Sequence, residues 1–478
     1  MKMKKTATTD AHMNAYALSR PDPEVVVAIR MRLAERLGAR VTISPAILEQ
    51  HSHGEGLPAV GIPDLVVFPE TNAEVAFILA LCNEYRVPVT PFGAGSSLEG
   101  QLAAVAGGVS LDMNRFDKVL EVTPESLDCR VQAGVTREAL NAHIRDTGLF
   151  FPVDPGANAS IGGMASTRAS GTNAVRYGTM RENILGLTVV TPDGRIVRTG
   201  SRARKSSAGL DLTHLYVGSE GTLGIITEIQ LKLYGMPETI VAAVCQFPSL
   251  DGAVAAVVTA LQSNLKMARI ELLDEVQMRA AIGYSKLDYA ETPTLFIEFH
   301  GSPNGVREEV EMMQAITAEH GGGEFQFAER PEDRSRLWKA RHNSYQAVMA
   351  LSPGKNNMGT DACVPISALP ACLLETKADI VASGLTAPIV GHVGDGNFHL
   401  GILFDPNDAD ETERAEALAF RTARRAIALG GTCSGEHGVG LHKIVHMEAE
   451  HGEGIELMKA VKKALDPKGI MNPGKIYP

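Results

Sequence analysis

The residues best suited to chemistry lie toward the C-terminus of the chain. His392 and His399 flank a Gly-Asp-Gly turn, and Glu436 and His437 follow further along, between two glycines. Because glycines disfavour a continuous helix, we expect a strand–turn–strand that lets both imidazoles converge on one point. Two histidines and a glutamate form a common divalent-metal set with open positions for a substrate. We expect Asp395, inside the turn, to shape the turn or support the ligands rather than to bind the metal.

The second feature is a set of glycine-rich loops. The 478 residues include 47 glycines but only one tryptophan, and many of the glycines are clustered. The loop 91–100 follows a predicted strand, as phosphate-binding loops do. It lacks the lysine of a nucleoside triphosphatase and the third glycine of a dinucleotide fingerprint. A second glycine- and serine-rich stretch covers 155–178, and a third covers 218–224. Exposed amides and small hydroxyls satisfy pyrophosphate oxygens without bulk, so the three loops predict one large cofactor lying along several backbones.

Motifs in these loops resemble the FAD-binding domain of the vanillyl-alcohol-oxidase-type flavoproteins: Pro91–Ser97, Asp154–Gly156, Ile161–Gly163, Arg176–Gly178 and Gly218–Gly224. From about residue 60 to its end, the chain resembles the FAD-dependent D-lactate dehydrogenases linked to a cytochrome or quinone. Siblings of that family are D-2-hydroxyglutarate dehydrogenase and the glycolate oxidase flavoprotein subunit. The resemblance implies an α+β fold, with a two-part FAD-binding domain and an α+β substrate (cap) domain that has a mainly antiparallel sheet.

The resemblance also implies how the cofactor is held. Some relatives attach the flavin through a histidine or cysteine in the first or second loop, and neither residue type occurs in 91–100 or 155–178. We therefore expect non-covalent FAD. The implied cofactor-binding residues are Phe92, Gly93, Ala94, Gly95, Ser96, Ser97, Pro155, Gly156, Ile161, Gly162, Gly163, Ser166, Gly171, Tyr177, Gly178, Glu220, Gly221, Ile225, Ile226 and Asn472.

Catalytic and metal-binding roles follow from the same resemblance. His392, His399 and Glu436 match the family's metal ligands, and zinc, manganese or iron would suit these ligand types. His437 matches the active-site base. Arg341 matches the arginine that grips the substrate carboxylate, for which its planar fork is suited, although a surface ion pair is the alternative.

The implied reaction is the FAD-dependent oxidation of a small D-2-hydroxy acid, assisted by the divalent metal. The resemblance favours D-lactate as the substrate and pyruvate as the product. Relatives acting on D-2-hydroxyglutarate carry a threonine where this chain has Tyr345, and a lysine just before the strand that contains Asp361. Here Lys355 is displaced from that position. D-2-hydroxyglutarate dehydrogenase and glycolate oxidase subunit remain alternatives, and a metal-dependent hydrolase or a flavin electron carrier without its own substrate are remote ones. The electron acceptor would be a quinone, cytochrome c or an electron-transfer flavoprotein.

The elements that must position these residues follow from hydrophobic periodicity and turn signals. We expect a helical lead-in over 1–55, an FAD-binding domain over 56–236, a substrate and metal-binding cap over 237–460, and a C-terminal segment over 461–478 that returns to the FAD domain. In the cap we expect a second sheet with helices on one face. Particular elements are a hairpin of Leu187–Thr191 and Ile196–Thr199, and helices over Pro23–Leu37, Asn72–Arg86, Leu250–Asn264, Ala328–Ala350 and Met447–Leu465.

Composition excludes several classes of protein. A hydrophobic content of 44% rules out a disordered chain, and a net charge of −11 argues against nucleic-acid binding. The cysteines form no CxxC pair, which excludes iron–sulfur spacing. The basic start, Met1–Lys5, precedes no apolar segment, and no run is long enough to span a membrane. We expect a cytoplasmic protein, with peripheral contact to the inner membrane and a homodimer as open options.

Overall fold

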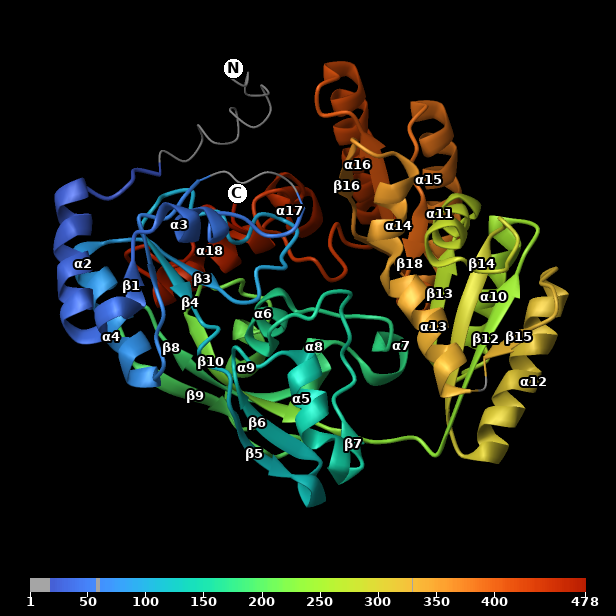
Figure 1. The fold of residues 1–478 in the computed structure, drawn as a ribbon, viewed down its shortest axis with the longest axis horizontal. Helices are drawn as coiled ribbons and strands as arrows, with labels where there is room; N and C mark the ends of the chain where they lie inside the picture. The colour runs from blue at the N-terminus through green and yellow to red at the C-terminus, as the bar shows by residue number, and fades with distance from the viewer. Residues whose placement is uncertain (1–17, 57–60, 329) are drawn as a thin grey trace.

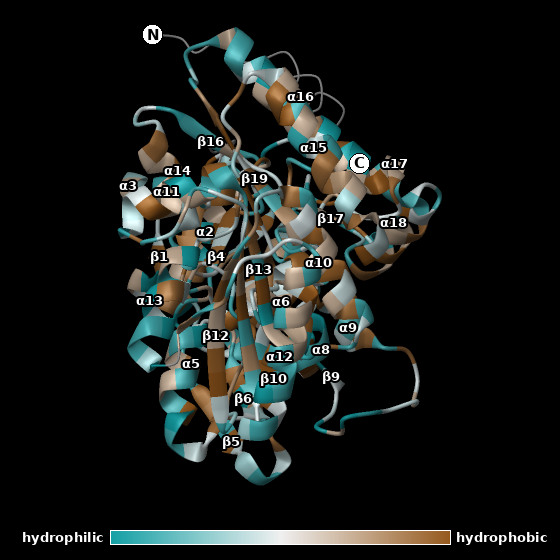
Figure 2. Ribbon diagram, turned by 90° about the vertical axis from the view of Figure 1, so that its right-hand side faces the viewer, coloured by the Kyte–Doolittle hydropathy of each residue, from teal (hydrophilic) through white to brown (hydrophobic). Residues whose placement is uncertain are grey.

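A computed structural model describes residues 18–56, 61–328 and 330–478, and in it the chain divides into two α+β parts (Figure 1). The N-terminal half runs from helix α2 (Pro23–Leu37) to strand β11 (Tyr234–Gly235), and the cap runs from β12 (Thr239–Gln246) to α16 (Ala409–Ala428). The basic start discussed above, Met1–Lys5, lies outside the described residues. The strands and inward helix faces carry the hydrophobic residues, drawn brown in Figure 2.

The first sheet of the N-terminal half has the order β1-β2-β4-β3, from Val41–Thr42, Leu65–Val67, Val109–Asp112 and Val89–Phe92. Strands β2, β4 and β3 are parallel, and β1 from the lead-in pairs antiparallel with β2. The predicted helix over Asn72–Arg86 is confirmed as α4 (Asn72–Tyr85), which begins after its N-cap Thr71 and ends where Arg86 takes a left-handed conformation. Lead-in helices α2 and α3 (Pro45–Gln50) flank this sheet, and α2 buries Ile29 and Leu33 against it. The first glycine loop leaves directly from β3.

A five-stranded antiparallel sheet completes the N-terminal half, in the order β5-β6-β10-β8-β9. The predicted hairpin is confirmed, because β8 and β9 pair with Val190 opposite Ile196 and the Thr191 amide donates to the Arg195 carbonyl. The strands are Val119–Thr123, Asp128–Gln132, Ile225–Lys232, Ile184–Val190 and Ile196–Gly200. The accompanying elements are α5 (Arg137–Ile144), α6 (Ile161–Thr167), α7 (Ala174–Tyr177), α8 (Met180–Asn183), α9 (Leu212–Tyr216) and the small β7–β11 ladder, with β7 at Leu149–Phe150.

The cap is built on one antiparallel sheet, as predicted. Its order is β15-β12-β14-β13-β18-β19-β16, with β17 also pairing β19. The strands other than β12 are β13 (Met267–Leu273), β14 (Thr294–Gly301), β15 (Gln326–Ala328), β16 (Asn356–Gly359), β17 (Ala362–Cys363), β18 (Ile389–Gly391) and β19 (Asn397–Phe404). The turn between β18 and β19 brings His392 and His399 side by side.

Helices cover both faces of the cap sheet, so the prediction of helices on one face is wrong. Ala243 and Cys245 of β12 pack into the core under α10 (Leu250–Gln262) and α12 (Pro303–Glu319), whereas Ala242 and Val244 pack toward α11 (Glu275–Ser285) and α13 (Pro331–His342). The sequence does contain a signal that both faces are covered: β12 contains a continuous apolar run, whereas a strand with one solvated face alternates apolar and polar residues. Helix α15 (Leu369–Ser383) and α16 extend the first of these layers.

Two predicted long helices are each divided. Within the predicted helix 328–350, Ala328 ends strand β15, and the described residues from 331 onward form α13 and α14 (Ser344–Leu351), which meet at Asn343. The stretch 447–465 forms α17 (Ile444–His451) and α18 (Gly454–Leu465), because Gly452, with φ of 50°, ends the first.

The C-terminal segment lies against the N-terminal half. The Val89 amide donates to the Ile470 carbonyl, the Asn472 amide donates to the Val89 carbonyl, and Val89 bridges Met471 in parallel. The red C-terminal helices in Figure 1 accordingly lie beside the blue elements. This return places Asn472 next to the first glycine loop.

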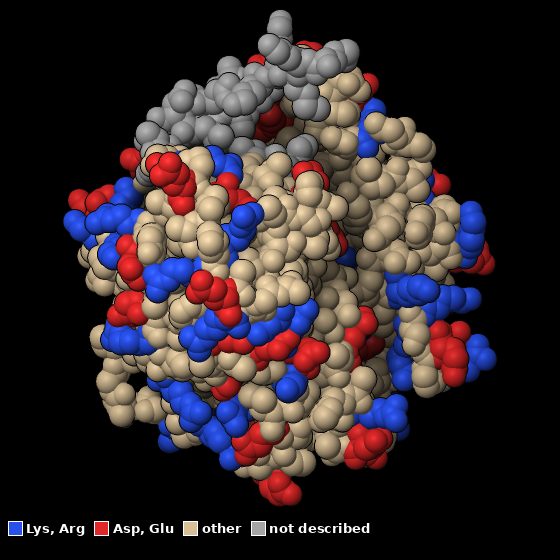
Figure 3. All heavy atoms as spheres, turned by 60° about the vertical axis from the view of Figure 1, so that its left-hand side comes forward, with Lys and Arg blue, Asp and Glu red and all other residues tan. Residues whose placement is uncertain are grey.

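Surface charge is mixed rather than gathered. On the face in Figure 3, acidic and basic side chains are interspersed, and neither sign forms a continuous field. Among the described residues, no helix is both long and apolar enough to cross a bilayer.

Candidate active site

A cavity of about 870 Å³ lies between the N-terminal half and the cap. All three glycine loops reach it, and so do the histidine cluster and the C-terminal segment. Its lining contains most residues predicted from the sequence: Phe92, Gly93, Ala94, Gly95, Ser96, Ser97, Pro155, Gly156, Gly162, Gly163, Ser166, Glu220, Gly221, Ile225, Ile226, Arg341, His392, His399, Glu436, His437 and Asn472.

The predicted metal ligands converge at the cap side of this cavity. The Nε2 atoms of His392 and His399 lie 3.2 and 3.4 Å from Oε1 of Glu436. One ligand atom from each of the three side chains lies within 4.8 Å of the others. The expected strand–turn–strand is confirmed, and it brings the two imidazole centroids to 5.4 Å.

Hydrogen bonds prepare both imidazoles for metal binding. His392 Nδ1 lies 2.7 Å from the Glu271 carboxylate, and His399 Nδ1 lies 3.0 Å from the Thr360 carbonyl. Both partners accept a hydrogen bond from Nδ1–H, which leaves the Nε2 atoms that face Glu436 free to bind a metal. The second oxygen of Glu436 is buried and has no hydrogen-bond partner among the described residues, as expected of a ligand atom awaiting a cation. The residues therefore fit a divalent metal.

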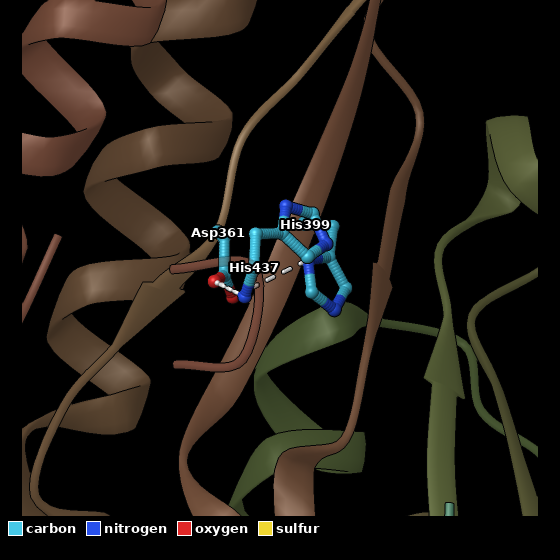
Figure 4. A group of neighbouring side chains, drawn as sticks. All are labelled: Asp361, His399 and His437. Carbon is cyan, nitrogen blue, oxygen red and sulfur yellow. Dashed lines mark hydrogen bonds and ion pairs between the residues drawn. The ribbon is translucent and has the colours of Figure 1, made fainter. Parts of the chain in front are cut away.

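A neighbouring group, Asp361, His399 and His437, has similar spacing (Figure 4). In this group His399 would have to use Nδ1, which already faces the Thr360 carbonyl. Asp361 is also fully engaged, because it accepts from the backbone amides of Glu436 and His437, at 2.8 Å each. Asp361 thus holds the loop that carries the predicted ligand Glu436 and the candidate base His437, and the first group is the better candidate for a metal site.

Arg341 is held at the cavity by a buried carboxylate. Its Nε and Nη2 lie 2.8 and 2.6 Å from Oε2 of Glu271, whose other oxygen meets His392. Burial by itself would raise the pKa of Glu271, but His392 and Arg341 offset this and hold the pKa below its ordinary value. One ionised side chain therefore orients both Arg341 and a predicted metal ligand.

His437 lies on the same wall. Its ring stacks on His399 at 5.0 Å with 11° between the planes, and its Nδ1 lies 3.3 Å from the Glu99 carboxylate. The Gln101 side chain donates to its backbone carbonyl at 2.8 Å. The base candidate is thus fixed by residues from both halves of the molecule.

Two family models match the chain: "FAD binding domain" over residues 63–200 and "FAD linked oxidases, C-terminal domain" over residues 236–476. The chain belongs to the FAD-linked oxidase family. A Danio rerio protein named probable D-lactate dehydrogenase, mitochondrial, is 52% identical over 440 residues, which cover 91% of this chain and 88% of the relative. An Arabidopsis thaliana protein named D-lactate dehydrogenase (cytochrome), mitochondrial, is 46% identical, with 90% and 77% covered. The Bacillus subtilis glycolate oxidase subunit GlcD is 36% identical, with 87% and 89% covered.

Solved structures of this FAD-linked oxidase type share the fold. An alkyldihydroxyacetonephosphate synthase superposes with a TM-score of 0.75 at 21% identity, over 96% of this chain and 88% of the other. The 4-ethylphenol oxidase from Gulosibacter chungangensis gives 0.74 at 18% identity, over 96% and 98%. The predicted fold class, a two-part FAD-binding domain of the vanillyl-alcohol-oxidase type with an antiparallel cap sheet, is confirmed, and FAD is the cofactor of the family.

The glycine loops of this oxidase fit a cofactor that lies close to the backbone. A Cβ on Gly221, where φ is 71°, would come within 2.3 Å of Pro91, so the first and third loops touch only because glycine is present. Gly156 differs, since it lines the cavity and a Cβ there would meet nothing within 4 Å. The space beside Gly156 is open to the cavity, as an approaching pyrophosphate requires.

A Gly156→Val substitution should therefore leave the fold intact and weaken FAD binding by about tenfold or more, because the side chain enters cofactor space. Flavin fluorescence titration of the apoprotein measures the effect. Gly235→Val is the matched control, since a Cβ at Gly235 also meets nothing within 4 Å but that residue is not among the cavity-lining residues. Equal FAD affinity in the two variants would contradict the placement of the second loop.

Four predicted cofactor residues are not among those lining the cavity. Ile161 is buried in the core beside the five-stranded sheet, and a Cβ on Gly171 would meet the Asp154 backbone. Tyr177 points to the cap, where its hydroxyl lies 2.8 Å from His300 Nδ1, and Gly178, with φ of 76°, ends α7. Their contact with FAD stays a prediction, and their visible role is to shape the loop and join the halves.

Sequence reasoning missed three carboxylates of the site: Glu271, Asp361 and Glu99. Glu271 has a local signal, because it is a fully buried carboxylate inside strand β13, whose other residues are apolar except for Arg269. Asp361 is also completely buried, between β16 and β17, and Glu99 lies within the first glycine loop itself. A charged residue buried in an apolar or glycine-rich segment needs an oppositely charged or hydrogen-bonding partner, but the sequence does not show which residue that is.

Proposed function

We propose that this chain oxidises a small D-2-hydroxy acid, D-lactate above others, to the 2-keto acid, with FAD and a divalent metal. One observation carries the proposal: the loops matched to an FAD-binding domain and the Arg341, His437 and His/Glu groups line one cavity. The names of the D-lactate dehydrogenase relatives support the substrate. A metal-dependent hydrolase would leave the glycine loops in that cavity without a role.

Arg341 would bind the substrate carboxylate. Glu271 engages Nε and Nη2 of the guanidinium, which fixes its plane and leaves further N–H donors for a carboxylate. The planar fork then sets the orientation of C2 of the hydroxy acid. Because Arg341 is only 8% exposed, this interaction is shielded from water and is stronger than a surface ion pair.

His437 would remove the hydroxyl proton. Its Nδ1 faces Glu99, which leaves Nε2 to accept a proton from a substrate in the cavity. When bound, FAD supplies the two-electron acceptor for the C2 hydride. A divalent metal held by His392, His399 and Glu436 would lower the pKa of the substrate hydroxyl. Exclusion of water by the buried lining would protect the charges that develop.

The lining favours a short substrate. Tyr345 and Val348 line the cavity together with Arg341, and neither side chain carries a positive charge for a second carboxylate. Lys355 is not among the lining residues and pairs with Glu411 instead. A second carboxylate would therefore find no lysine at that position, which supports lactate over 2-hydroxyglutarate.

Purified protein should be yellow, and D-lactate should bleach its flavin absorbance under anaerobic conditions while L-lactate does not. A site that holds the carboxylate at Arg341, meets the hydroxyl at His437 and removes the hydride from one side accepts only one enantiomer. The names of the D-lactate dehydrogenase relatives support the D form. Stopped-flow spectra with D-lactate, L-lactate, glycolate and D-2-hydroxyglutarate rank the substrates. Colourless protein without extractable flavin would overturn the proposal, and faster bleaching by glycolate or D-2-hydroxyglutarate would reassign the substrate.

We further propose a cytochrome-type protein as the electron acceptor, which the names of the Arabidopsis thaliana and Saccharomyces cerevisiae relatives support. Reduction of cytochrome c, a quinone analogue or an electron-transfer flavoprotein by the D-lactate-reduced enzyme separates the candidates. The cytoplasmic location and the homodimer stay predictions; the relatives named above as D-lactate dehydrogenases are mitochondrial by name.

A further inference from the structure

Glu99 is a buried carboxylate that the proposed chemistry leaves without a task. It belongs to the first glycine loop, yet its side chain points away from the loop and toward residues 437–443. Its Oε1 lies 3.3 Å from His437 Nδ1 and 2.9 Å from the Lys443 ammonium, and its side chain is 7% exposed. The Glu99 carboxylate thus lies between the imidazole of the candidate base His437 and the ammonium group of Lys443.

The backbone around Glu99 is held as firmly as its side chain. The Leu441 amide donates to the Glu99 carbonyl at 2.8 Å, and the Gln101 side chain accepts from the Glu99 amide at 3.0 Å. A Cβ on Gly440, where φ is 51°, would come within 2.0 Å of the Glu99 carbonyl, so this approach requires glycine. The first glycine loop and the loop that carries His437 therefore meet in one geometry.

The charges around Glu99 keep it ionised. Burial by itself would raise the pKa of Glu99, but Lys443, His437 and His442 more than offset this and hold the pKa well below its ordinary value. Lys443 also lies 3.6 Å from Asp361, and His442 lies 3.7 Å from the second Glu99 oxygen. An ionised carboxylate can only accept hydrogen bonds, so the His437 nitrogen that faces it must carry a proton.

We infer that Glu99 is a positioning residue for the base: its carboxylate holds His437 with the proton on Nδ1 and the Nε2 lone pair toward the cavity. Lys443 holds the carboxylate in turn, and the stack of His437 on His399 fixes the plane of the ring. This inference rests on the proposed function, in which His437 is the base. When the substrate O–H bond breaks and the proton moves to Nε2, the resulting imidazolium is stabilised by Glu99.

This arrangement also joins the base to the flavin side of the molecule. Glu99 comes from the N-terminal half, whereas His437 follows the cap, so the orientation of the base depends on contact between the two parts. A purely structural ion pair between Lys443 and Glu99 is the competing explanation. It predicts a loss of stability upon substitution without a specific loss of proton transfer.

Two substitutions separate these explanations. Glu99→Gln keeps the shape but allows an amide N–H to face Nδ1, which permits the wrong tautomer. Glu99→Asp keeps the charge for Lys443 but shortens the reach to His437. We expect each variant to slow flavin reduction at saturating D-lactate by about 10–100-fold, with KM within about threefold and flavin content unchanged. In the His437→Asn variant, adding either Glu99 substitution should slow flavin reduction by less than about twofold further, because the residue through which Glu99 acts is absent.

A control and a readout independent of turnover complete the test. Asp379→Asn breaks another cap ion pair, with Arg421 and Arg425, and should leave flavin reduction unchanged. In ¹⁵N-histidine spectra of the substrate-free holoenzyme, the His437 Nε2 signal, assigned by its loss in His437→Asn, should be unprotonated in the wild type and averaged in Glu99→Gln. An unchanged tautomer, or equal losses with and without His437, would overturn the inference. If no hydroxy acid bleaches the flavin of the wild-type enzyme, the proposed function is overturned instead. The tautomer of His437 would still test whether Glu99 positions that ring.

Discussion

Replacing His437 with asparagine should slow flavin reduction by D-lactate by about 10²–10⁴-fold, the range that a positioned general base contributes. Asparagine can still donate to Glu99 but offers no basic nitrogen to the cavity. Substrate binding depends on Arg341, so KM should change little. Burial by itself would lower the pKa of His437, but Asp361 and Glu99 outweigh it and raise the pKa. Since the base works only when neutral, the wild-type rate should rise with pH through this pKa, and the variant should lack that limb.

Anaerobic stopped-flow measurements over a range of pH values test this expectation. His446→Asn is a matched control, because His446 is a nearby buried imidazole, 5.0 Å from the Phe420 ring, that is not among the cavity-lining residues. Burial lowers the pKa of His446 to about 4, so this ring is neutral and takes no part in the titration. If the His437→Asn enzyme kept the wild-type rate and pH profile, another group would have to accept the substrate hydroxyl proton.

Glu436→Gln should abolish binding of the proposed divalent metal and slow flavin reduction by about 10³-fold, or about 4 kcal/mol of lost transition-state stabilisation. The amide offers one neutral oxygen where the carboxylate offers two charged ones, and the buried Oε2 is the atom left open for a cation. Elemental analysis of the purified protein and flavin reduction rates measure the two effects. FAD content should stay unchanged, since the cofactor loops lie in the other half of the molecule.

Asp395→Asn provides the control for the metal set. Asp395 lies in the turn between the two histidines, but the groups with ligand spacing do not include it. Burial raises the pKa of its carboxyl to about 7, so the neutral amide is a close mimic. This variant should retain both metal and rate. Chelator-treated enzyme that turns over at the original rate while free of metal would contradict a catalytic metal.

Local patterns predict much of this molecule. The hairpin at 192–195 follows from turn chemistry, and helix α4 follows from its apolar face and its cap at Thr71. Two predictions are wrong despite local signals in the sequence: Gly452, with positive φ, ends a helix inside the predicted 447–465, and the continuous apolar run of β12 indicates a strand covered on both faces. The exact ends of a helix are less well defined by a periodic pattern than its existence, and they shift by about one or two residues.

The sequence by itself determined the chemistry available: three glycine loops for one cofactor, and the His392, His399 and Glu436 set beside a candidate base. Residue type and spacing suffice there, because backbone amides cradle phosphate and imidazoles bind metal wherever a turn brings them together. Tertiary structure alone decided which charges face each other. Glu271 joins Arg341 to His392, and Glu99 meets His437 from more than three hundred residues away. A buried charge is stabilised only by partners that the fold supplies, so these pairs follow from packing and not from pattern.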